Sequence, residues 1–310
     1  MRVIITGGTG LIGRTLSASL APDGHEVIIL SRTPERATGV TEGVRVERWD
    51  GRTATGWAPW ADGADAIVNL AGANLAGEGF FPSRWTDERK RLIRESRISA
   101  GRAVVAAVEQ ASAKPRVVIQ ASGIGYYGFH AEKQLAEGMP AGKDFLARFA
   151  DEEWEPSTAP VETMGVRRAI IRSGVLLNVK EGALLRQMLP FRLFAGGPIG
   201  NGKQWLSWIH PADHIAAIRF LIDNEAASGP FNLCAPNPVT NAQFSRALGR
   251  VMNRPSWLPL PGLTMRLAFG EVSDLLLKGQ RGTPKRLQEL GFSFRYPVVE
   301  AALHDIVRSS

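Results

Sequence analysis

Hydrophobic and polar positions follow two recurring periods along the first 175 residues. Short runs of consecutive or alternating apolar residues, typical of strands, are separated by stretches with apolar residues three and four positions apart, typical of one helix face. The sequence predicts a helix that begins at Leu11 and further helices over residues 87–111 and 144–155. The predicted strands cover residues 2–6, 25–30, 44–49, 64–70, 115–122 and 166–173. This alternation of strands and helices indicates an α/β fold, a doubly wound parallel sheet built from βαβ units.

The pattern changes after residue 176, where the alternation weakens and proline and glycine become frequent. Residues 213–223 and 241–252 are predicted helices. Thr283 followed by Pro284 predicts another helix start, with threonine as the N-cap and proline at the first helical position. We therefore divide the chain into a first domain, residues 1–175, and a smaller mixed lobe, residues 176–310, whose elements are expected to interleave with the first domain.

The turn between the first strand and the first helix is rich in glycine and reads Thr6-Gly7-Gly8-Thr9-Gly10-Leu11-Ile12-Gly13. Glycines at this spacing permit a tight turn, let the backbone approach a pyrophosphate and let the helix pack closely on the strand. The N-terminus of the helix also offers free N–H groups and a partial positive charge to phosphates. The context predicts a dinucleotide site whose contacts come from Thr6, Gly7, Gly10, Leu11, Ile12 and Gly13.

The end of the second predicted strand indicates which dinucleotide binds. An NAD site carries an Asp or Glu about 20 residues beyond the glycines, where it binds the ribose 2′-hydroxyl. Here that place holds Ser31, followed by Arg32, with Arg36 one turn further on. A carboxylate would repel a 2′-phosphate, whereas a guanidinium binds it with two parallel hydrogen bonds. The sequence therefore predicts NADP(H), with Arg32 and Arg36 at the 2′-phosphate; the alternative is that both are ordinary surface arginines.

Composition and charge narrow the class of protein. The 310 residues are 44% hydrophobic and 22% charged, ordinary for a globular chain, and no apolar run approaches the length of a membrane span. The single cysteine excludes an intrachain disulfide framework and no leader pattern precedes the first strand, so we expect a cytoplasmic protein. The net charge of +7 suits an anionic small molecule. Acidic residues interrupt the basic stretch 84–102 at helical spacing, so we expect an ion-paired helix face there and no nucleic-acid or membrane partner.

Together with further segments along the whole chain, these motifs resemble the extended short-chain dehydrogenase/reductase superfamily, which contains sugar-nucleotide epimerases and dehydratases. The narrower resemblance is to its atypical branch, the epimerase family proteins, also described as SulA-like. Gly125-Tyr126-Tyr127-Gly128 is fairly specific for this branch, whereas the glycine-rich turn is shared across the superfamily. The other segments that carry the resemblance are residues 69–72, 96–98, 208–213, 229–232, 279–281 and 284–287.

The resemblance assigns roles to residues at the carboxyl ends of the predicted strands. It implies that Asp50 accepts a hydrogen bond from the adenine amino group and that Ser122 lies near the nicotinamide. Both have an alternative explanation as turn or capping residues. The remaining residues that it places at the cofactor are Leu70, Ala71 and Gly72 at the ribose and pyrophosphate, and Gly174 and Val175 at the nicotinamide carboxamide.

The chain departs from the superfamily in its catalytic residues. The usual acid/base is a tyrosine with a lysine four residues later on the same helix face, where the ammonium lowers the tyrosine pKa. The positions four residues after the three tyrosines hold His130, Ala131 and Glu300, so this dyad is absent. The resemblance favours Ser122 and Tyr127 as catalytic residues, although an unassisted tyrosine is a poor base at neutral pH. The further candidates for a proton donor are Tyr126, Glu137, Lys143 and His210.

Three hypotheses for function remain at this point. The first is an NADP(H)-dependent oxidoreductase or epimerase-like enzyme that acts on a small carbonyl or hydroxylated substrate, sugar-like ones included. The second is a non-catalytic NADP(H)-binding sensor, for which the SulA-like label suggests a role in cell division. The third is an inactive fold kept for assembly. In the superfamily, the helices predicted over residues 87–111 and 144–155 often form a homodimer, so a homodimer is an expectation here too.

The segment from His210 to His214 invites a metal site, because two histidines four residues apart with an aspartate between them can bind zinc. No third ligand cluster accompanies them, so we predict no metal. Asp213 is instead expected to cap the helix that follows or to hold a neighbouring loop.

Overall fold

The computed structural model describes residues 1–77 and 79–308. Its centre is a seven-stranded sheet with the order β3-β2-β1-β4-β5-β7-β11, in which every neighbouring pair is parallel. The strands are β1 (Arg2–Thr6), β2 (Glu26–Ser31), β3 (Arg45–Arg48), β4 (Ala66–Asn69), β5 (Val117–Gly123), β7 (Arg167–Ser173) and β11 (Gly229–Leu233). The predicted doubly wound α/β fold is confirmed. The strand order reverses between β1 and β4, and a sheet of this kind leaves its ligand crevice at such a point.

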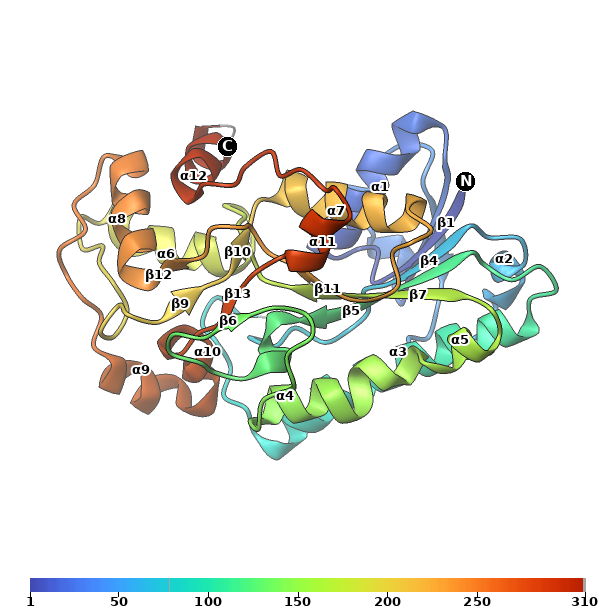
Figure 1. The fold of residues 1–310 in the computed structure, drawn as a ribbon, viewed down its shortest axis with the longest axis horizontal. Helices are drawn as coiled ribbons and strands as arrows, with labels where there is room; N and C mark the ends of the chain where they lie inside the picture. Colours follow the sequence, from blue (N-terminus) through green and yellow to red (C-terminus); the bar gives the residue numbers. More distant parts are fainter. Residues whose placement is uncertain (78, 309–310) are drawn as a thin grey trace.

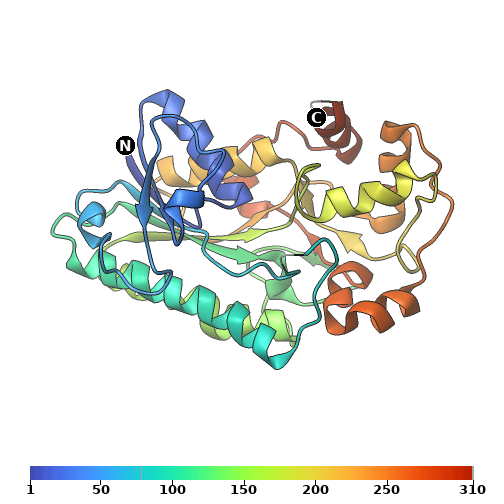
Figure 2. The same cartoon turned by 180° about the vertical axis from the view of Figure 1, so that it is seen from behind.

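Helices cover both faces of this sheet, with α1 and α7 on one side and α3 on the other (Figures 1 and 2). Their bounds are α1 (Leu11–Leu20), α7 (Pro211–Asp223) and α3 (Asp87–Gln110). Within β1, Val3 and Ile5 pack in the core cluster of α1 and α7, whereas Ile4 packs in the cluster of α3. Successive residues of a strand point to opposite faces, and both faces are apolar because helices cover both.

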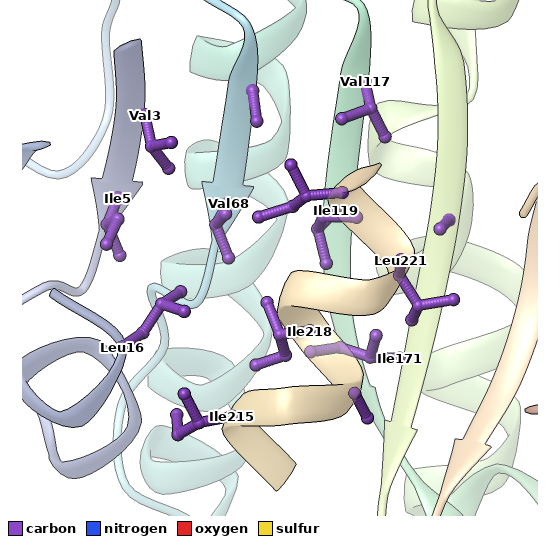
Figure 3. Close-up of a cluster of buried hydrophobic side chains, with 14 of the residues drawn as sticks. Val3, Ile5, Leu16, Val68, Val117, Ile119, Ile171, Ile215, Ile218 and Leu221 are labelled. Carbon is purple, nitrogen blue, oxygen red and sulfur yellow. The ribbon is translucent and has the colours of Figure 1, made fainter. Parts of the chain in front are cut away.

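The second half of the chain also contributes to the first layer, by which we mean the seven-stranded sheet and the helices that cover it. Helix α7 directs Ile215, Ile218 and Leu221 into this core; Ile218 lies beside Ile119 and Ile171, and Ile215 lies toward Leu16 (Figure 3). Strand β11 extends the sheet beside β7. The two halves of the chain are therefore interleaved: on this face α1 packs against β1 and β2, and α7 packs against β5.

The rest of the second half forms a lobe beyond the carboxyl ends of the strands, with its own core around Trp208, Phe244 and Leu303. Its helices are α6 (Gly182–Arg192), α8 (Asn241–Met252), α9 (Gly262–Phe269), α10 (Asp274–Leu277) and α12 (Val299–Arg308). Helix α11 (Lys285–Glu289) instead packs beside β11, with Leu287 in the core of the central sheet. Two two-stranded pairs connect the second half to earlier segments: β8 (Val175–Leu176) with β10 (Trp208–Ile209), and β6 (Gln134–Leu135) with β13 (Arg281–Gly282). A third pair, β9 (Trp205–Leu206) with β12 (Val239–Thr240), lies within the second half itself. Within the described residues, no helix is both long enough and apolar enough to cross a membrane.

The helix predicted over residues 144–155 is present, but its winding is irregular. It begins as α4 (Phe145–Phe149), widens into the π-helical turn Ala150–Trp154, tightens into the 3-10 turn Glu155–Thr158 and ends in the short α5 (Pro160–Thr163). Pro156 and Pro160 lack the N–H that a regular helix needs. The change of winding turns Glu155 into the protein, where it is 6% exposed.

The predicted N-cap at Thr283 is wrong. Helix α11 begins at Lys285 and its N-cap position is Pro284. The backbone of Thr283 is engaged elsewhere, because its N–H donates to the Leu135 carbonyl and its carbonyl accepts from Asn232 Nδ2. These bonds extend the β6–β13 pair by one residue, so the helix begins only at Lys285.

A fully buried histidine makes the stability of this fold dependent on pH. His214 in α7 has Nε2 2.9 Å from Ser173 Oγ, and its Nδ1 has no partner among the described residues. Burial lowers the pKa of His214 from 6.5 to about 4. Between pH 6.5 and 4 the unfolded chain binds a proton at this site that the folded chain does not. The free energy of unfolding should therefore fall by about 3 kcal/mol as the pH falls through this range.

Urea unfolding at pH 7.0 and pH 4.5, on the wild type and on His214→Leu, measures this contribution. We expect the wild type to lose about 2–3 kcal/mol more than the variant, because carboxylates that titrate in both proteins cancel. Equal losses in the two proteins would show that His214 does not control the acid sensitivity.

Candidate functional site

The glycine-rich turn forms a cradle at the carboxyl end of β1. Gly7 has a φ of +64°, in the left-handed region that favours glycine, and its carbonyl accepts from the Gly10 N–H at 3.0 Å. Gly10 is the N-cap of α1, and no side chain caps this helix. The first N–H groups of α1, from Leu11 onward, therefore face the crevice without a side-chain acceptor, as an anion site requires.

The other glycines are required by close packing. A Cβ atom on Gly8 would lie 2.4 Å from Ile29 Cβ, and one on Gly13 would lie 2.5 Å from Gly8 Cα. A Cβ on Gly10 would meet only the Gly7 carbonyl, at 3.3 Å, and Gly10 is exposed. Gly10 is therefore the residue over which a pyrophosphate can approach the backbone, whereas Gly8 and Gly13 let α1 lie close to the strand.

A chain of buried polar side chains fixes the loops under this cradle. Thr6 Oγ1 donates to Asn69 Oδ1 at 2.6 Å and accepts from the Leu70 and Ala71 N–H groups, at 3.1 and 3.2 Å. Asn69 Nδ2 in turn donates to Gln120 Oε1 at 2.8 Å. Thr6 is fully buried, and its side chain ties the ends of β1 and β4 together; its contact with the cofactor stays a prediction.

The loop after β4 rests on a buried arginine that the sequence placed on a solvated helix face. Arg97 is only 7% exposed, donates from Nη1 to the Ala73 and Ile93 carbonyls, and stacks 4.6 Å from the Trp154 ring centroid. Burial lowers the pKa of Arg97 to about 10. A Cβ on Gly72 would lie 2.8 Å from the Arg97 guanidinium carbon, so glycine is needed there. On the same helix, Lys90, Arg91 and Arg94 are ion-paired with Glu271, Glu95 and Glu153.

The far end of the cradle carries an unpaired cation. Arg32, just beyond β2, is exposed, and its guanidinium has no hydrogen bond or ion pair with the described residues. Its side chain passes Gly51, where a Cβ would lie 3.4 Å from Arg32 Cδ. The nearby carboxylate of Glu35 is bridged to Arg48 at 2.8 Å. Arg36 is exposed one turn further on. This end of the crevice can therefore receive an anion without displacing an existing ion pair.

Asp50 holds the turn after β3. Its Oδ1 accepts from the Arg52 and Thr53 N–H groups at 2.7 and 2.8 Å, and Oδ2 accepts from Thr53 Oγ1 at 2.7 Å. Slight burial raises the pKa of Asp50, but these hydrogen bonds together lower it by more, so the pKa lies below its ordinary value. The turn role is thus present in the structure; the adenine contact stays a prediction.

A buried ion pair lies at the nicotinamide end of the predicted crevice. Arg172 on β7 and Glu155 make two bonds, Nε to Oε1 at 2.9 Å and Nη2 to Oε2 at 2.8 Å, and their side chains are 4% and 8% exposed. Ser122 on β5 is register-paired with Arg172 and donates from Oγ to Glu155 Oε1 at 2.7 Å. The ion pair therefore fixes the Ser122 hydroxyl. The sequence pattern did not predict that Glu155 is buried, because its burial depends on the irregular winding of residues 150–158.

Tyr127 is part of this buried cluster and does not line an open site. Its side chain is fully buried; its hydroxyl donates to Asn232 Oδ1 at 2.8 Å and accepts from Arg172 Nη1 at 3.0 Å. Burial raises the pKa of Tyr127 to about 12, although Arg172 opposes the shift. In this structure the Tyr127 hydroxyl is engaged both as a donor, to Asn232, and as an acceptor, from Arg172; its role as a proton donor stays a prediction. The neighbouring Tyr126 stacks on the Arg172 guanidinium at 3.3 Å and donates to Asp151 at 2.9 Å.

Four further residues that the sequence analysis named as cofactor or proton-donor candidates lie outside the Arg172–Glu155 ion pair. The N–H groups of Gly174 and Val175 donate hydrogen bonds to the carbonyls of Leu233 and Ser207, at 2.9 and 2.7 Å. Glu137 is buried; burial raises its pKa, and its Oε2 has no partner among the described residues. Lys143 is exposed.

The histidine segment is structural. His210, not Asp213, caps α7, with Nδ1 accepting from the Ala212 N–H at 3.0 Å. Asp213 accepts from the Arg295 and Tyr296 N–H groups, at 2.8 and 2.9 Å, so it holds the segment before α12. Across residues 1–77 and 79–308, no cluster of histidine, cysteine and carboxylate side chains has the grouping of a metal site.

The parallel sheet, the uncapped helix start and the glycine cradle define a dinucleotide-binding protein of the extended short-chain dehydrogenase/reductase class. The chain belongs to the epimerase family proteins within that class, as the sequence resemblance predicted. Residues 3–144 match the NAD dependent epimerase/dehydratase family, and residues 260–306 match a domain of unknown function, DUF1731.

Relatives cover almost the full chain. Epimerase family protein YfhF of Bacillus subtilis is 40% identical over 99% of this chain and 98% of its own length. The chloroplastic epimerase family protein SDR39U1 homolog of Arabidopsis thaliana is 38% identical over 99% of this chain and 87% of its own. The crystal structure of human epimerase family protein SDR39U1 with NADPH superposes with a TM-score of 0.87, at 31% identity and full coverage of both chains.

Proposed function

We propose that this protein is an NADP(H)-dependent oxidoreductase or epimerase-like enzyme acting on a small carbonyl or hydroxylated substrate. The observation that carries the proposal is the unpaired Arg32 guanidinium at the end of a glycine cradle whose carboxylate neighbour, Glu35, is already bridged. The human relative crystallised with NADPH supports the same cofactor. Leu70, Ala71 and Gly72 would line the ribose and pyrophosphate, and Gly174 and Val175 the nicotinamide end.

The Arg32→Ala variant tests the choice of cofactor. Loss of a charge-assisted pair of hydrogen bonds should raise the Kd for NADPH by about 10- to 100-fold. The Kd for NADH, which has no 2′-phosphate, should change by less than about two-fold. Fluorescence titration of both nucleotides measures the difference, with Arg45→Ala on strand β3 as the control. An equal loss of NADPH and NADH affinity would contradict the assignment of Arg32 to the 2′-phosphate.

The residues of this chain would bind, orient and exclude water, while the bound nucleotide supplies the hydride chemistry. The cradle from Gly7 to Gly13 would hold the pyrophosphate against the start of α1. Ser122 already donates its proton to Glu155, so its free lone pair would accept a hydrogen bond from a substrate hydroxyl and fix that oxygen. The Glu155–Arg172 pair would keep Ser122 in this orientation through the reaction.

A non-catalytic NADP(H) sensor is the second candidate, because the sealed Tyr127 and the absent tyrosine–lysine dyad leave no ordinary acid/base. Incubation with NADPH deuterated at the nicotinamide C4, together with a panel of small aldehydes and ketones, separates the two. Deuterium recovered in a product supports the enzyme. NADPH binding without deuterium transfer to any compound supports the sensor.

A further inference from the structure

A small cavity lies between the first layer and the C-terminal lobe. Ile124, which directly follows β5, and Val175 on β8 line it from the first layer, so it adjoins the end of the strand that carries Ser122. Its volume is about 40 Å³, which is room for about three water molecules. The cavity therefore accepts a group of only a few non-hydrogen atoms.

The wall of this cavity is largely apolar. Val175 and Leu206 also pack on the core of the lobe, and Ile124 belongs to a small core of its own with Tyr127 and Leu135. The hydrophobic residues that line the cavity are Ile124, Val175, Trp205, Leu206, Leu275 and Leu276. Such a wall favours carbon atoms of a ligand over water, because their contact removes apolar surface from solvent.

The lining offers no unpaired charge. Lys278 is bridged to Asp274 at 2.8 Å, and its ammonium lies 5.1 Å from the Phe129 ring centroid. Apart from Lys278, the described residues that line the cavity include no lysine, arginine, histidine, aspartate or glutamate. An anion that entered would lose its water without meeting a free cation, which is strongly unfavourable. The lining therefore favours an uncharged group.

Two carboxamide side chains in the lining are available to recognise such a group. Gln187 on α6 and Gln280 before β13 are half-buried, and their side chains make no hydrogen bond with the described residues. The Ser207 hydroxyl, by contrast, already donates to the Gln280 carbonyl and accepts from the Gly282 N–H, both at 2.8 Å. A carboxamide offers two N–H donors and one acceptor oxygen, which together suit a carbonyl or a hydroxyl group.

We propose that this cavity binds an uncharged end of the substrate, a carbonyl or hydroxyl group on a short alkyl chain, and discriminates against carboxylates and phosphates. Gln187 and Gln280 supply the hydrogen bonds, and the apolar wall covers the carbon atoms. The inference rests on the proposed function, because it names the substrate class for the crevice beside Ser122. It makes Gln187 and Gln280 residues that determine specificity.

The test compares acetone, acetamide and sodium acetate, which are planar and of nearly equal size but differ in charge. The signals are the side-chain carboxamide resonances of Gln187 and Gln280 in a ¹⁵N spectrum of the full chain, assigned with Gln187→Leu and Gln280→Leu, at pH 7 and constant ionic strength. We expect acetone and acetamide to shift these resonances saturably and acetate to bind at least about ten-fold more weakly. Acetate binding as tight as that of acetone, or no saturable shift with either neutral probe, overturns the proposal.

Inorganic phosphate is a further arm of the same titration. A saturable shift of the two carboxamides with phosphate, at an affinity equal to that of acetamide or higher, overturns the exclusion of anions. No response to phosphate is the expected result.

The Gln280→Arg variant places a free cation in the lining and should raise the acetate affinity by about ten-fold or more. Gln110→Arg is the matched control, because it adds the same charge at an exposed position. Gln110 ends α3 just before β5 begins, at the opposite edge of the sheet, so acetate binding should not change there. No gain in acetate affinity in a folded Gln280→Arg protein overturns the role given to Gln280. If that variant does not fold, the contrast between acetone and acetate in the wild type decides alone.

NADPH titration of the same samples separates this inference from the proposed function. NADPH binding without any response to acetone or acetamide overturns the inference about the cavity and leaves the cofactor site intact. Failure of the wild type to bind NADPH overturns the proposed function itself.

Discussion

Replacing Glu155 by glutamine should lower the free energy of unfolding by about 3–5 kcal/mol, because it leaves the buried Arg172 charge without its counter-ion. Arg172 is 4% exposed at its side chain and receives both of its short carboxylate contacts from Glu155. Although burial lowers it, the hydrogen bonds and charge of Glu155 hold the pKa of Arg172 above its ordinary value. Arg172 therefore cannot escape the penalty by losing its proton near neutral pH.

Glu153→Gln is the matched control, two residues away in the same irregular segment. Glu153 bridges Arg94 at 2.7 Å, but the two side chains are 29% and 48% exposed, so the change should lower stability by less than about 1 kcal/mol. Urea unfolding at pH 7 followed by circular dichroism measures both variants. Similar losses for the two variants would contradict the role given to the buried pair. We also expect Glu155→Gln to release the Ser122 hydroxyl and so to reduce turnover in the proposed reaction.

The second large effect is expected from Gly13→Ala. The added Cβ would lie 2.5 Å from Gly8 Cα and 2.7 Å from the Gly7 carbonyl oxygen, and both obstacles are backbone. The turn must move away from α1, which should lower stability by about 1–3 kcal/mol. The same movement takes Gly10 and the helix start out of position, so the Kd for NADPH should rise by about ten-fold or more, equivalent to 1.4 kcal/mol.

Gly138→Ala serves as the control for this variant. A Cβ at Gly138 meets nothing within 4 Å, and its φ lies outside the positive range, so neither stability nor NADPH affinity should change. Thermal unfolding and fluorescence titration with NADPH measure the two quantities. Wild-type NADPH affinity in a folded Gly13→Ala protein would show that the cradle does not hold the nucleotide.

The residues that the sequence identified at the glycine cradle depend on local structure. A strand, a glycine-rich turn and a helix follow one another within 20 residues, so the spacing of Gly7, Gly10 and Gly13 is visible without the rest of the fold. The absence of a carboxylate after β2 is equally local, because the strand end and Arg32 are adjacent in the chain. Family membership was also accessible from short motifs along the chain.

The cluster around Ser122 was decided by contacts between distant segments. Glu155, Arg172 and Tyr127 come from an irregular helix, a strand and a 3-10 turn, and Asn232 joins them from β11, 105 residues after Tyr127. The predicted helix over residues 144–155 would have left Glu155 unassigned. The π-helical turn over residues 150–154 precedes Glu155, whose carboxylate is buried, and no local sequence pattern predicts this irregular winding.

The sequence by itself determined the parallel α/β fold, the cradle and the cation beside it, because each follows from residues close together in the chain and from the period of apolar positions. Only the tertiary structure decided that Tyr127 is sealed, that Arg97 is buried under Gly72 and that Glu155 pairs with Arg172 in the interior. The physical reason is that burial and pairing of a polar side chain depend on what the rest of the chain packs against it, and periodicity contains no information about those partners.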